Sequence, residues 1–260
     1  MNNVLDNYLT VAPTHQNALD IFRGQWTSRL PPPWDSLVAG SVPLFEDTRT
    51  TWAIEQMGGV GGKTVLELGP LEGGIPYILE KSGAKYILAI EANTVAFLRC
   101  LIVKEILGLA KVRYLCGDFR PYLRDSNEYF DVIFASGVLY HMTDPIQLLF
   151  DLSLRTRQLY IWTHYYDPAL VASNEVIRNR LGPAQHLEFE GFQYEQHSYN
   201  YDIALNWPGF CGGTGQFCAW LTRDSILGAL RKFGFTQIRI GFEALDHPNG
   251  PCFSIVAERV

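Results

Sequence analysis

Acidic residues close or follow three apolar runs in this chain, at points where each could meet a ligand. Glu67 and Gly69 end the first run, Glu91 ends the second, and Asp118 follows the third. A carboxylate offers two acceptor oxygens, which suit a vicinal diol or an exocyclic amino group. Glu91 comes 22 residues after Gly69, near the ~20 residues at which an acid can accept from ribose hydroxyls. The spacing indicates a nucleoside site, although each acid alone is also typical of a turn.

The first of these groups belongs to the stretch Thr64–Gly74, which runs TVLELGPLEGG. The pattern predicts a buried parallel strand, a glycine-rich loop and the start of a helix. Glycine has no Cβ, so a ligand can approach the backbone there, and helix N-terminal N–H groups are free to donate. An ordinary strand-to-helix turn would have the same pattern.

Two cofactors suit such a loop, a nicotinamide dinucleotide and S-adenosylmethionine. The dinucleotide fingerprint G-x-G-x-x-G needs a small residue where the backbone meets pyrophosphate, and Leu71 fills that position here. Glu72 would repel a pyrophosphate, whereas Glu67 or Glu72 could attract the ammonium of a methionyl tail. The loop therefore favours S-adenosylmethionine.

The elements that position these residues alternate between strand and helix, which predicts an α/β fold with a mainly parallel sheet. The closing pair of strands is joined by a link too short for a helix, which predicts antiparallel pairing. The predicted strands are Lys63–Leu68, Tyr86–Ile90, Val112–Cys116, Phe130–Ala135, Gln158–Trp162, Phe235–Phe242 and Cys252–Glu258. The predicted helices are Glu46–Met57, Gly73–Ser82, Thr94–Leu107, Asp144–Arg155 and Leu221–Lys232.

Two segments stand outside this alternation. We expect residues 1–46 to form an N-terminal arm that either packs on the main domain, through Trp26 and Trp34, or covers a ligand site as a lid. We expect residues 47–260 to form the main domain, with an insert at about 164–220. The insert is too long for a plain connection, which predicts its own small structure or a functional role.

Composition excludes several classes of protein. The formal net charge of −6 gives no electrostatic footprint for non-specific nucleic-acid binding, so we expect no nucleic-acid partner. Five cysteines without a C-x-x-C pair indicate no disulfide framework and fit a reducing cytosol. No signal pattern and no apolar run of about 18 residues are present, so we expect a cytoplasmic protein without a membrane span. The oligomeric state is not predicted.

A longer run of residues resembles class I S-adenosylmethionine-dependent methyltransferases. The run consists of Glu67–Gly74, then Glu91, then Gly117-Asp118-Phe119, then Gly137–His141. The resemblance implies a Rossmann-like, seven-stranded, mostly parallel sheet with an antiparallel last strand, helices on both faces and an insert between strands 5 and 6. It also implies S-adenosyl-L-methionine as cofactor and S-adenosyl-L-homocysteine as product. Leu71 stands where the family usually has its second glycine.

The same resemblance implies a role for each cofactor residue. The methionine portion would contact Glu67, Gly69, Pro70, Leu71 and Gly73. The ribose would meet Glu91, followed by Ala92 and Asn93, and the adenine would meet Asp118 and Phe119. Ser136 and Gly137 would lie near the sulfur. A second likeness, in the runs Gly137–Pro145 and Trp220–Arg223, is to the tRNA wobble-uridine carboxymethyltransferase branch.

Candidates for catalysis and substrate binding follow the later strands. His141 is the first candidate for a general base and His164 the second, because an unperturbed histidine titrates near neutrality; either is equally typical of a structural histidine. The aromatic insert predicts an acceptor pocket containing Tyr165, Tyr199 and Trp207, to which Tyr140, beside His141, would add its ring, unless these rings are core. The spacing of His164, His186 and His197 matches no metal motif, so no metal is predicted.

The function indicated is transfer of a methyl group from S-adenosylmethionine to a small-molecule acceptor. Two other functions stay open, a tRNA- or protein-modifying transferase and a non-catalytic subunit that keeps the cofactor fold. The first should show a basic face, and the second should bind the cofactor weakly or not at all.

Overall fold

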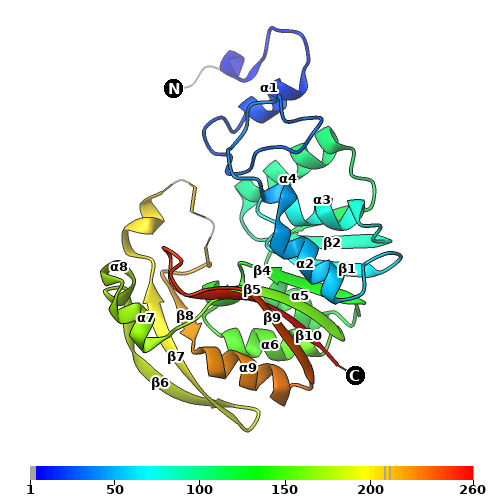
Figure 1. Ribbon diagram of the computed structural model, residues 1–260. Coiled ribbons are helices and arrows are strands. Elements are labelled where there is room, and N and C mark those ends of the chain that lie inside the picture. Colours follow the sequence, from blue (N-terminus) through cyan, green and yellow to red (C-terminus); the bar gives the residue numbers. More distant parts are fainter. Residues whose placement is uncertain (1–3, 208, 211, 260) are drawn as a thin grey trace.

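A seven-stranded sheet forms the centre of the protein in a computed structural model that describes residues 4–207, 209–210 and 212–259 (Figure 1). The strand order is β3-β2-β1-β4-β5-β10-β9. Strands β1 to β5 pair in parallel, and β10 pairs antiparallel with both β5 and β9. The strands are β1 (Thr64–Leu68), β2 (Tyr86–Glu91), β3 (Val112–Cys116), β4 (Val132–Ser136), β5 (Gln158–His164), β9 (Gln237–Ala244) and β10 (Cys252–Glu258). The predicted architecture and its antiparallel closing pair are confirmed.

Helices cover both faces of this sheet because side chains on successive strand residues point to opposite faces. In β1, Leu66 and Leu68 join the core beneath three helices, α5 (Phe119–Asp125), α6 (Pro145–Ser153) and α9 (Arg223–Lys232). Val65 joins the opposite core, beneath α2 (Thr48–Gln56), α3 (Gly74–Lys81) and α4 (Thr94–Leu107). Glu67 lies two residues from Val65, so its carboxyl faces that second side.

Most predicted elements agree with the structure within one or two residues, and α4 and β3 agree at both ends. Asn93 caps the start of α4, where its side chain accepts from the N–H groups of Val95 and Ala96. Gly108 ends the helix in the left-handed conformation, as the sequence predicted. Among the helices that cover the main sheet, α5 is absent from the sequence-based prediction.

The insert carries a second sheet of three antiparallel strands, β6 (Leu181–Phe189), β7 (Phe192–Asn200) and β8 (Phe217–Leu221). Figure 1 shows this sheet beside the main one, next to α9. Three short helices belong to the same region, α7 (Pro168–Ala172), α8 (Glu175–Arg178) and the 3-10 helix η4 (Asp202–Asn206). Another 3-10 helix, η3 (Leu139–His141), follows β4.

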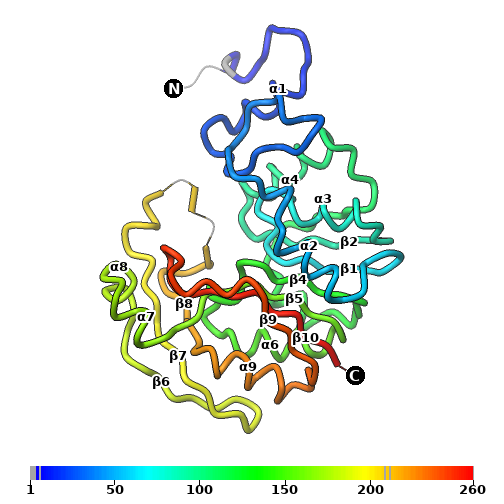
Figure 2. The backbone as a smooth tube through the Cα atoms, in the orientation of Figure 1, coloured from blue at the N-terminus to red at the C-terminus, as the bar shows by residue number. Residues whose placement is uncertain are grey.

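Residues 4–46 contain little regular structure: η1 (Val4–Asn7), α1 (His15–Asp20) and η2 (Leu44–Glu46). Figure 2 traces them through α1 down to α2. Trp26, Leu30 and Phe45 are buried in the core shared with α2, α3 and α4, and Trp34 packs against it. These contacts hold the N-terminal arm to the main domain; its role as a lid stays a prediction. Across the described ranges, no helix has the length and hydropathy of a membrane span.

Candidate functional site

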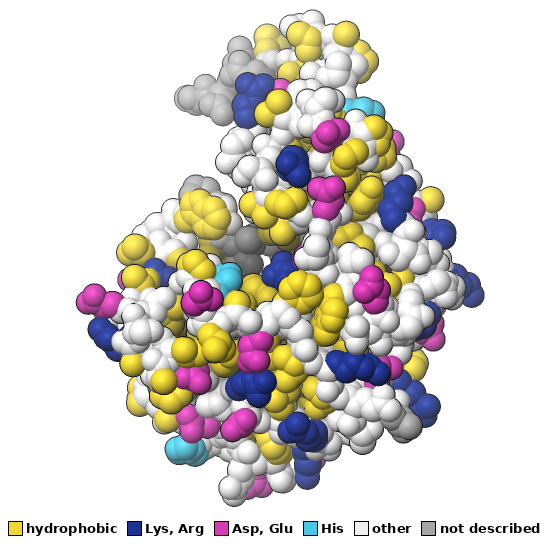
Figure 3. Space-filling model, in the orientation of Figure 1, with side chains coloured by type: hydrophobic (Ala, Val, Ile, Leu, Met, Phe, Trp, Pro, Cys, Tyr) yellow, Lys and Arg dark blue, Asp and Glu magenta, His cyan; other side chains and the backbone are white. Residues whose placement is uncertain are grey.

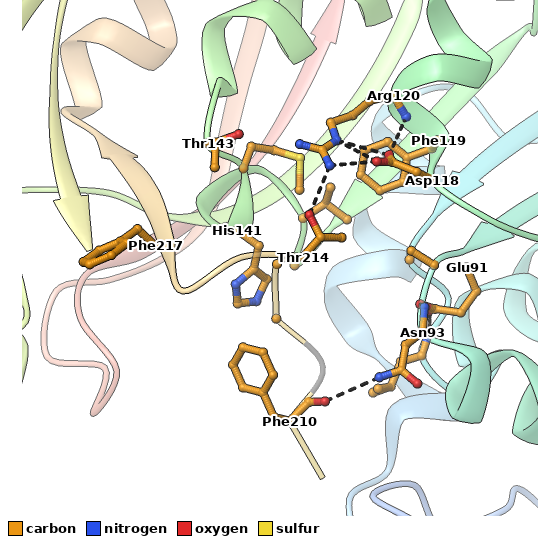
Figure 4. A pocket seen from close by; sticks show the side chains of 18 residues that line it. Glu91, Asn93, Asp118, Phe119, Arg120, His141, Thr143, Phe210, Thr214 and Phe217 are labelled. Carbon is orange, nitrogen blue, oxygen red and sulfur yellow. Dashed lines mark hydrogen bonds and ion pairs between the residues drawn. The ribbon is translucent and has the colours of Figure 1, made fainter. Parts of the chain in front are cut away.

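Two adjoining cavities lie at the carboxyl ends of the parallel strands, where ligands bind in open α/β sheets. The first, the nucleoside cavity, has a volume of about 260 Å³ and is drawn in Figure 4. The second, the tail cavity, has a volume of about 240 Å³ and shares Gly69, Leu71, Gly137 and His141 with the first. Eight predicted cofactor residues line the nucleoside cavity: Gly69, Leu71, Glu91, Ala92, Asn93, Asp118, Phe119 and Gly137.

Glu91 ends β2 with its carboxylate held by two backbone N–H groups. Its Oε2 accepts from Leu71 N at 3.1 Å, and its Oε1 accepts from Asn93 N at 2.8 Å. Burial raises the pKa of the Glu91 carboxyl above its ordinary value, although these hydrogen bonds oppose the shift. Each oxygen keeps a further lone pair, so the carboxylate can still accept from a diol.

Asp118 caps α5 and anchors a contact between the sheet edge and the insert. It accepts from Arg120 N at 2.8 Å and pairs with the Arg120 side chain at 2.7 Å. Burial alone would raise the pKa of the Asp118 carboxyl, but the hydrogen bonds from Arg120 outweigh it and lower that pKa. Arg120 also donates to Thr214 Oγ1 at 3.1 Å (Figure 4). The pair therefore joins the nucleoside cavity to the insert.

The tail cavity contains a buried acid without a partner. Glu67 is fully buried, and neither of its carboxyl oxygens accepts a hydrogen bond from the part of the chain that the structure describes. Burial, followed by the nearby Glu91, raises the pKa of Glu67 well above its ordinary value. Pro70 and Ser136, also predicted from the sequence, line the same cavity. A buried polar group without a partner calls for an explanation, and a cationic ligand would supply one.

Glu72, the other acid of the loop, is not available to a ligand. It lines the tail cavity, but its Oε1 accepts from Thr27 N and pairs with Arg99, and its Oε2 accepts from Ser28 N. The interpretation that either acid could attract an ammonium is therefore wrong for Glu72. Its carboxylate instead fixes the N-terminal arm to α4.

Gly73 does not line a cavity as the sequence predicted, and Leu71 takes a backbone conformation typical of glycine. Gly73 lines neither cavity; it has φ of +84°, and a Cβ there would lie 2.6 Å from the Tyr114 hydroxyl. Leu71 adopts a left-handed φ of 57°, a conformation that glycine favours. The backbone thus keeps the shape of a glycine loop at Leu71, and the Glu91 carboxylate holds its N–H.

The candidate bases do not titrate near neutrality. His141 lines both cavities, and burial followed by the nearby His164 lowers its pKa to about 3. His164 lies beneath the site, where its Nδ1 donates to Gly250 O at 2.9 Å and its ring stacks on Trp220. Burial lowers the pKa of His164 to about 4. The expectation of an unperturbed histidine is therefore wrong for both, because burial disfavours the imidazolium.

Of the four aromatic residues predicted to bind substrate, only Tyr140 lines either cavity. Tyr165 is buried against Phe253 and donates to Glu243. Tyr199 stacks on Trp220, and Trp207 is 63% exposed. The insert instead lines the nucleoside cavity with five residues, Phe210, Gly212, Gly213, Thr214 and Phe217. These contacts cross from one sheet to the other, which local sequence patterns do not reveal.

Charged residues that sequence reasoning missed also line the tail cavity. Arg49, from the first turn of α2, donates through Nε and Nη2 to Asp47, and its guanidinium lies 4.6 Å from the Trp162 ring centroid. In the sequence, the only sign of this site was the pair of opposite charges, Asp47 and Arg49, in the helix predicted before the first strand. Arg49 places a cation in the cavity that holds Glu67.

One group of potential metal ligands occurs among the described residues, His164, His247 and Cys252, whose ligand atoms lie within 4.8 Å of one another. His247 Nδ1 already accepts from Asn249 N. The positive charge of Arg49 acts on all three members of the group. Both features disfavour a cation, and the prediction of no metal stays a prediction.

No family model matches the chain. Several solved structures are similar to it. The N-terminal domain of EvdMO1 with SAH bound has a TM-score of 0.68 at 21% identity, covering 94% of this chain and 95% of that one. Magnesium protoporphyrin IX methyltransferase from Synechocystis PCC 6803, with bound SAH, has a TM-score of 0.55 at 15% identity, covering 82% and 81%. The chain has the fold of S-adenosylmethionine-dependent methyltransferases.

Other relatives extend this likeness. A Burkholderia thailandensis 1,6-didemethyltoxoflavin-N1-methyltransferase structure has a TM-score of 0.54 at 12% identity, covering 94% of this chain and 84% of that one. Two curated tRNA U34 carboxymethyltransferases match shorter stretches. The Psychrobacter arcticus protein is 25% identical over 121 residues, and the Campylobacter hominis protein is 32% identical over 91 residues. These stretches cover 41% and 35% of this chain and 34% and 31% of the relatives, about a third of their length.

Proposed function

We propose that the protein is a methyltransferase that binds S-adenosylmethionine across the two cavities and methylates a small molecule. The observation that carries this proposal is the buried, unpartnered carboxyl of Glu67 in the tail cavity, which also contains the Arg49 cation. An amino-acid tail bears an ammonium and a carboxylate. A cavity with one acid and one cation complements both charges.

The tail would lie with its ammonium at Glu67 and its carboxylate toward Arg49. Arg49 commits Nε and Nη2 to Asp47, which leaves Nη1 to reach a ligand. The carboxylates of Glu67 and Glu91, which both lie beside the loop, would repel the negative charges of a pyrophosphate. This charge pattern supports the sulfonium cofactor over a dinucleotide.

The nucleoside would occupy the first cavity. Glu91 would accept from the ribose hydroxyls, and Asp118 would accept from the adenine amino group while the Phe119 ring stacks on the base. Ser136 ends β4 and Gly137 follows it; both would lie near the sulfur, where the two cavities meet. The cofactor's methyl would then face the region between Tyr140 and His141.

Methyl transfer from a sulfonium is an in-line displacement, so alignment of the acceptor with the C–S bond supplies much of the rate enhancement. This chain's residues would hold the cofactor at both ends and exclude water with Phe210 and residues 212–217 of the insert. Bound S-adenosylmethionine supplies the electrophilic methyl group. The product would be S-adenosylhomocysteine.

A small acceptor suits the surface better than a nucleic acid. The chain carries a net charge of −6, and basic and acidic side chains alternate over the face drawn in Figure 3. A nucleic-acid binder needs a clustered basic footprint. The tRNA alternative is favoured by one observation, the local identity to the tRNA U34 carboxymethyltransferases.

Titration calorimetry with S-adenosylhomocysteine tests the proposal. We expect binding by the wild type, and roughly 10- to 150-fold weaker binding by Glu91→Ala, because a hydrogen bond to a charged group contributes about 1.5–3 kcal/mol. NADH serves as the competing ligand. Binding of NADH in place of S-adenosylhomocysteine, or equal affinity for S-adenosylhomocysteine in both proteins, would contradict the assignment. Titration with bulk tRNA tests the tRNA-modifying alternative, which requires measurable binding of tRNA.

A further inference from the structure

Ser28, in the N-terminal arm, contributes a buried hydroxyl group to the tail cavity. The residue lines that cavity and is only 1% exposed. Its Oγ has no hydrogen-bond partner within the described part of the chain. A buried hydroxyl without a partner carries a cost in free energy, and native structures rarely leave one unexplained. A ligand group in the cavity would supply the missing partner.

The backbone of Ser28 is held from two sides. Its N–H donates to Glu72 Oε2 at 2.7 Å, and its carbonyl accepts from Gly40 N at 2.9 Å. A β-bridge to Val42 keeps the segment extended. The returning part of the arm can pass this closely because it carries a glycine: a Cβ on Gly40 would lie 2.2 Å from the carbonyl carbon of Thr27. Within the described chain, the hydroxyl is thus the one polar group of Ser28 that has no partner.

The groups that line the tail cavity with Ser28 favour a negative charge. Arg49 pairs with Asp47 through Nε and Nη2, which leaves Nη1 to reach a ligand. Gly74 and Ile75, the first two residues of α3, line the same cavity, and the cap of this helix makes no side-chain hydrogen bond. The N–H groups at the start of a helix attract anions. A carboxylate therefore suits this part of the cavity, whereas an ammonium would be repelled by the guanidinium.

We propose that the Ser28 hydroxyl donates a hydrogen bond to the carboxylate of the cofactor's amino-acid tail, together with Arg49 and the start of α3. Glu67 receives the ammonium of the same tail. The N-terminal arm is thus part of the cofactor site, and a bound tail joins the arm to the main domain. The inference rests on the proposed function for the identity of the ligand, and it adds a binding residue from outside the α/β sheet.

Titration calorimetry with two ligands tests the assignment. S-adenosylhomocysteine carries the carboxylate, and decarboxylated S-adenosylhomocysteine lacks only that group and keeps the ammonium. Ser28→Ala should bind S-adenosylhomocysteine roughly 10- to 150-fold more weakly than the wild type does, because the lost hydrogen bond is to a charged group. It should bind the decarboxylated compound with wild-type affinity. Equal losses for the two ligands, or no loss for either, would overturn the inference.

Two variants serve as matched controls. Thr27→Ala removes the neighbouring hydroxyl of the same arm, which lines neither cavity, so both affinities should stay unchanged. Glu67→Gln should weaken both ligands, because both keep the ammonium. A loss in Thr27→Ala as large as that in Ser28→Ala would contradict the role of Ser28. A loss in Glu67→Gln confined to S-adenosylhomocysteine would place the carboxylate, and not the ammonium, at Glu67.

Urea titration of the empty protein separates ligand binding from packing. Ser28→Ala removes a hydroxyl that has no partner in the described chain, so its urea midpoint should equal or exceed that of the wild type. A lower midpoint, or a variant that does not fold, would show that the hydroxyl stabilises the protein itself and would overturn the inference. If the wild type does not bind S-adenosylhomocysteine, the proposed function fails. If the wild type binds it and Ser28→Ala binds it equally well, only the role of Ser28 fails.

Discussion

The unpartnered acid in the tail cavity makes cofactor binding a proton-coupled event. Burial and the nearby Glu91 raise the pKa of Glu67 well above its ordinary value, so the acid holds a proton in the empty protein over a range above pH 4.5. An ammonium beside it favours the carboxylate. S-adenosylhomocysteine binding should therefore release up to one proton, which calorimetry in phosphate and Tris buffers measures as a difference in apparent enthalpy.

The matched perturbation is Glu67→Gln, which keeps the shape and removes the charge. A charged hydrogen bond contributes about 1.5–3 kcal/mol, so S-adenosylhomocysteine should bind roughly 10- to 150-fold more weakly. The lower part of that range is expected, because the wild type also bears the cost of ionising a buried acid. Proton release should disappear in this variant.

Two controls make the result specific to Glu67. 5′-Methylthioadenosine lacks the amino-acid tail, so its affinity should be the same for wild type and Glu67→Gln. Wild-type affinity for S-adenosylhomocysteine should rise with pH and level off above the pKa of Glu67 in the empty protein. In Glu91→Gln that inflection should move to lower pH, because one cause of the raised pKa is gone. Unchanged affinity in Glu67→Gln, together with no proton release, would refute the reasoning.

Three further measurements test the protonation of Glu67, the pairing of Glu72 with Arg99, and the contact between Thr214 and Arg120. Between pH 4.5 and the raised pKa, Glu67 keeps its proton in the folded protein and loses it in the unfolded chain. The free energy of unfolding of the empty wild type should therefore fall as pH rises, by at most about 1.4 kcal/mol per pH unit. Glu67→Gln should remove this slope in urea titrations. Glu72→Gln leaves the Arg99 charge buried and should cost about 3–5 kcal/mol, visible as a large drop in urea midpoint; a drop under 1 kcal/mol would contradict its anchoring role. Thr214→Val removes the contact with Arg120 and should speed release of S-adenosylhomocysteine several-fold in stopped-flow traces; an unchanged rate would show that the contact does not retain the ligand.

The strand ends could be predicted because they depend on local features. The apolar runs, the spacing from Gly69 to Glu91, and the Asn93 and Gly108 caps are all determined within one βα unit. Helix α5 was missed because it has only seven residues, too few for a clear 3.6-residue period, and contains Pro121. Proline in a first helical turn is tolerated, but in sequence it resembles a break.

What sequence could not predict depends on contacts between distant segments. Strand β6 includes Gly182 and Pro183, which are atypical of strands, and its pairing with β7 shifts register near them. The pKa of His141 follows from burial between η3 and the insert, and burial of this kind is a property of the folded chain. Tyr165 and Tyr199 line neither cavity, which the sequence could not reveal because composition does not distinguish a pocket ring from a core ring.

The two acids of the loop show how a remote segment assigns roles to neighbouring residues. Glu67 and Glu72 lie five positions apart, and charge alone made them equivalent in the sequence. Their partners separate them: the backbone N–H groups of Thr27 and Ser28 in the N-terminal arm and the Arg99 side chain of α4 bind Glu72, which leaves Glu67 as the acid without a partner among the described residues. If the arm were detached, Glu72 would lose two backbone donors and keep Arg99 of α4 as its partner. Docking of the arm therefore completes the pairing of Glu72, whereas the arm's role as a lid is a separate prediction.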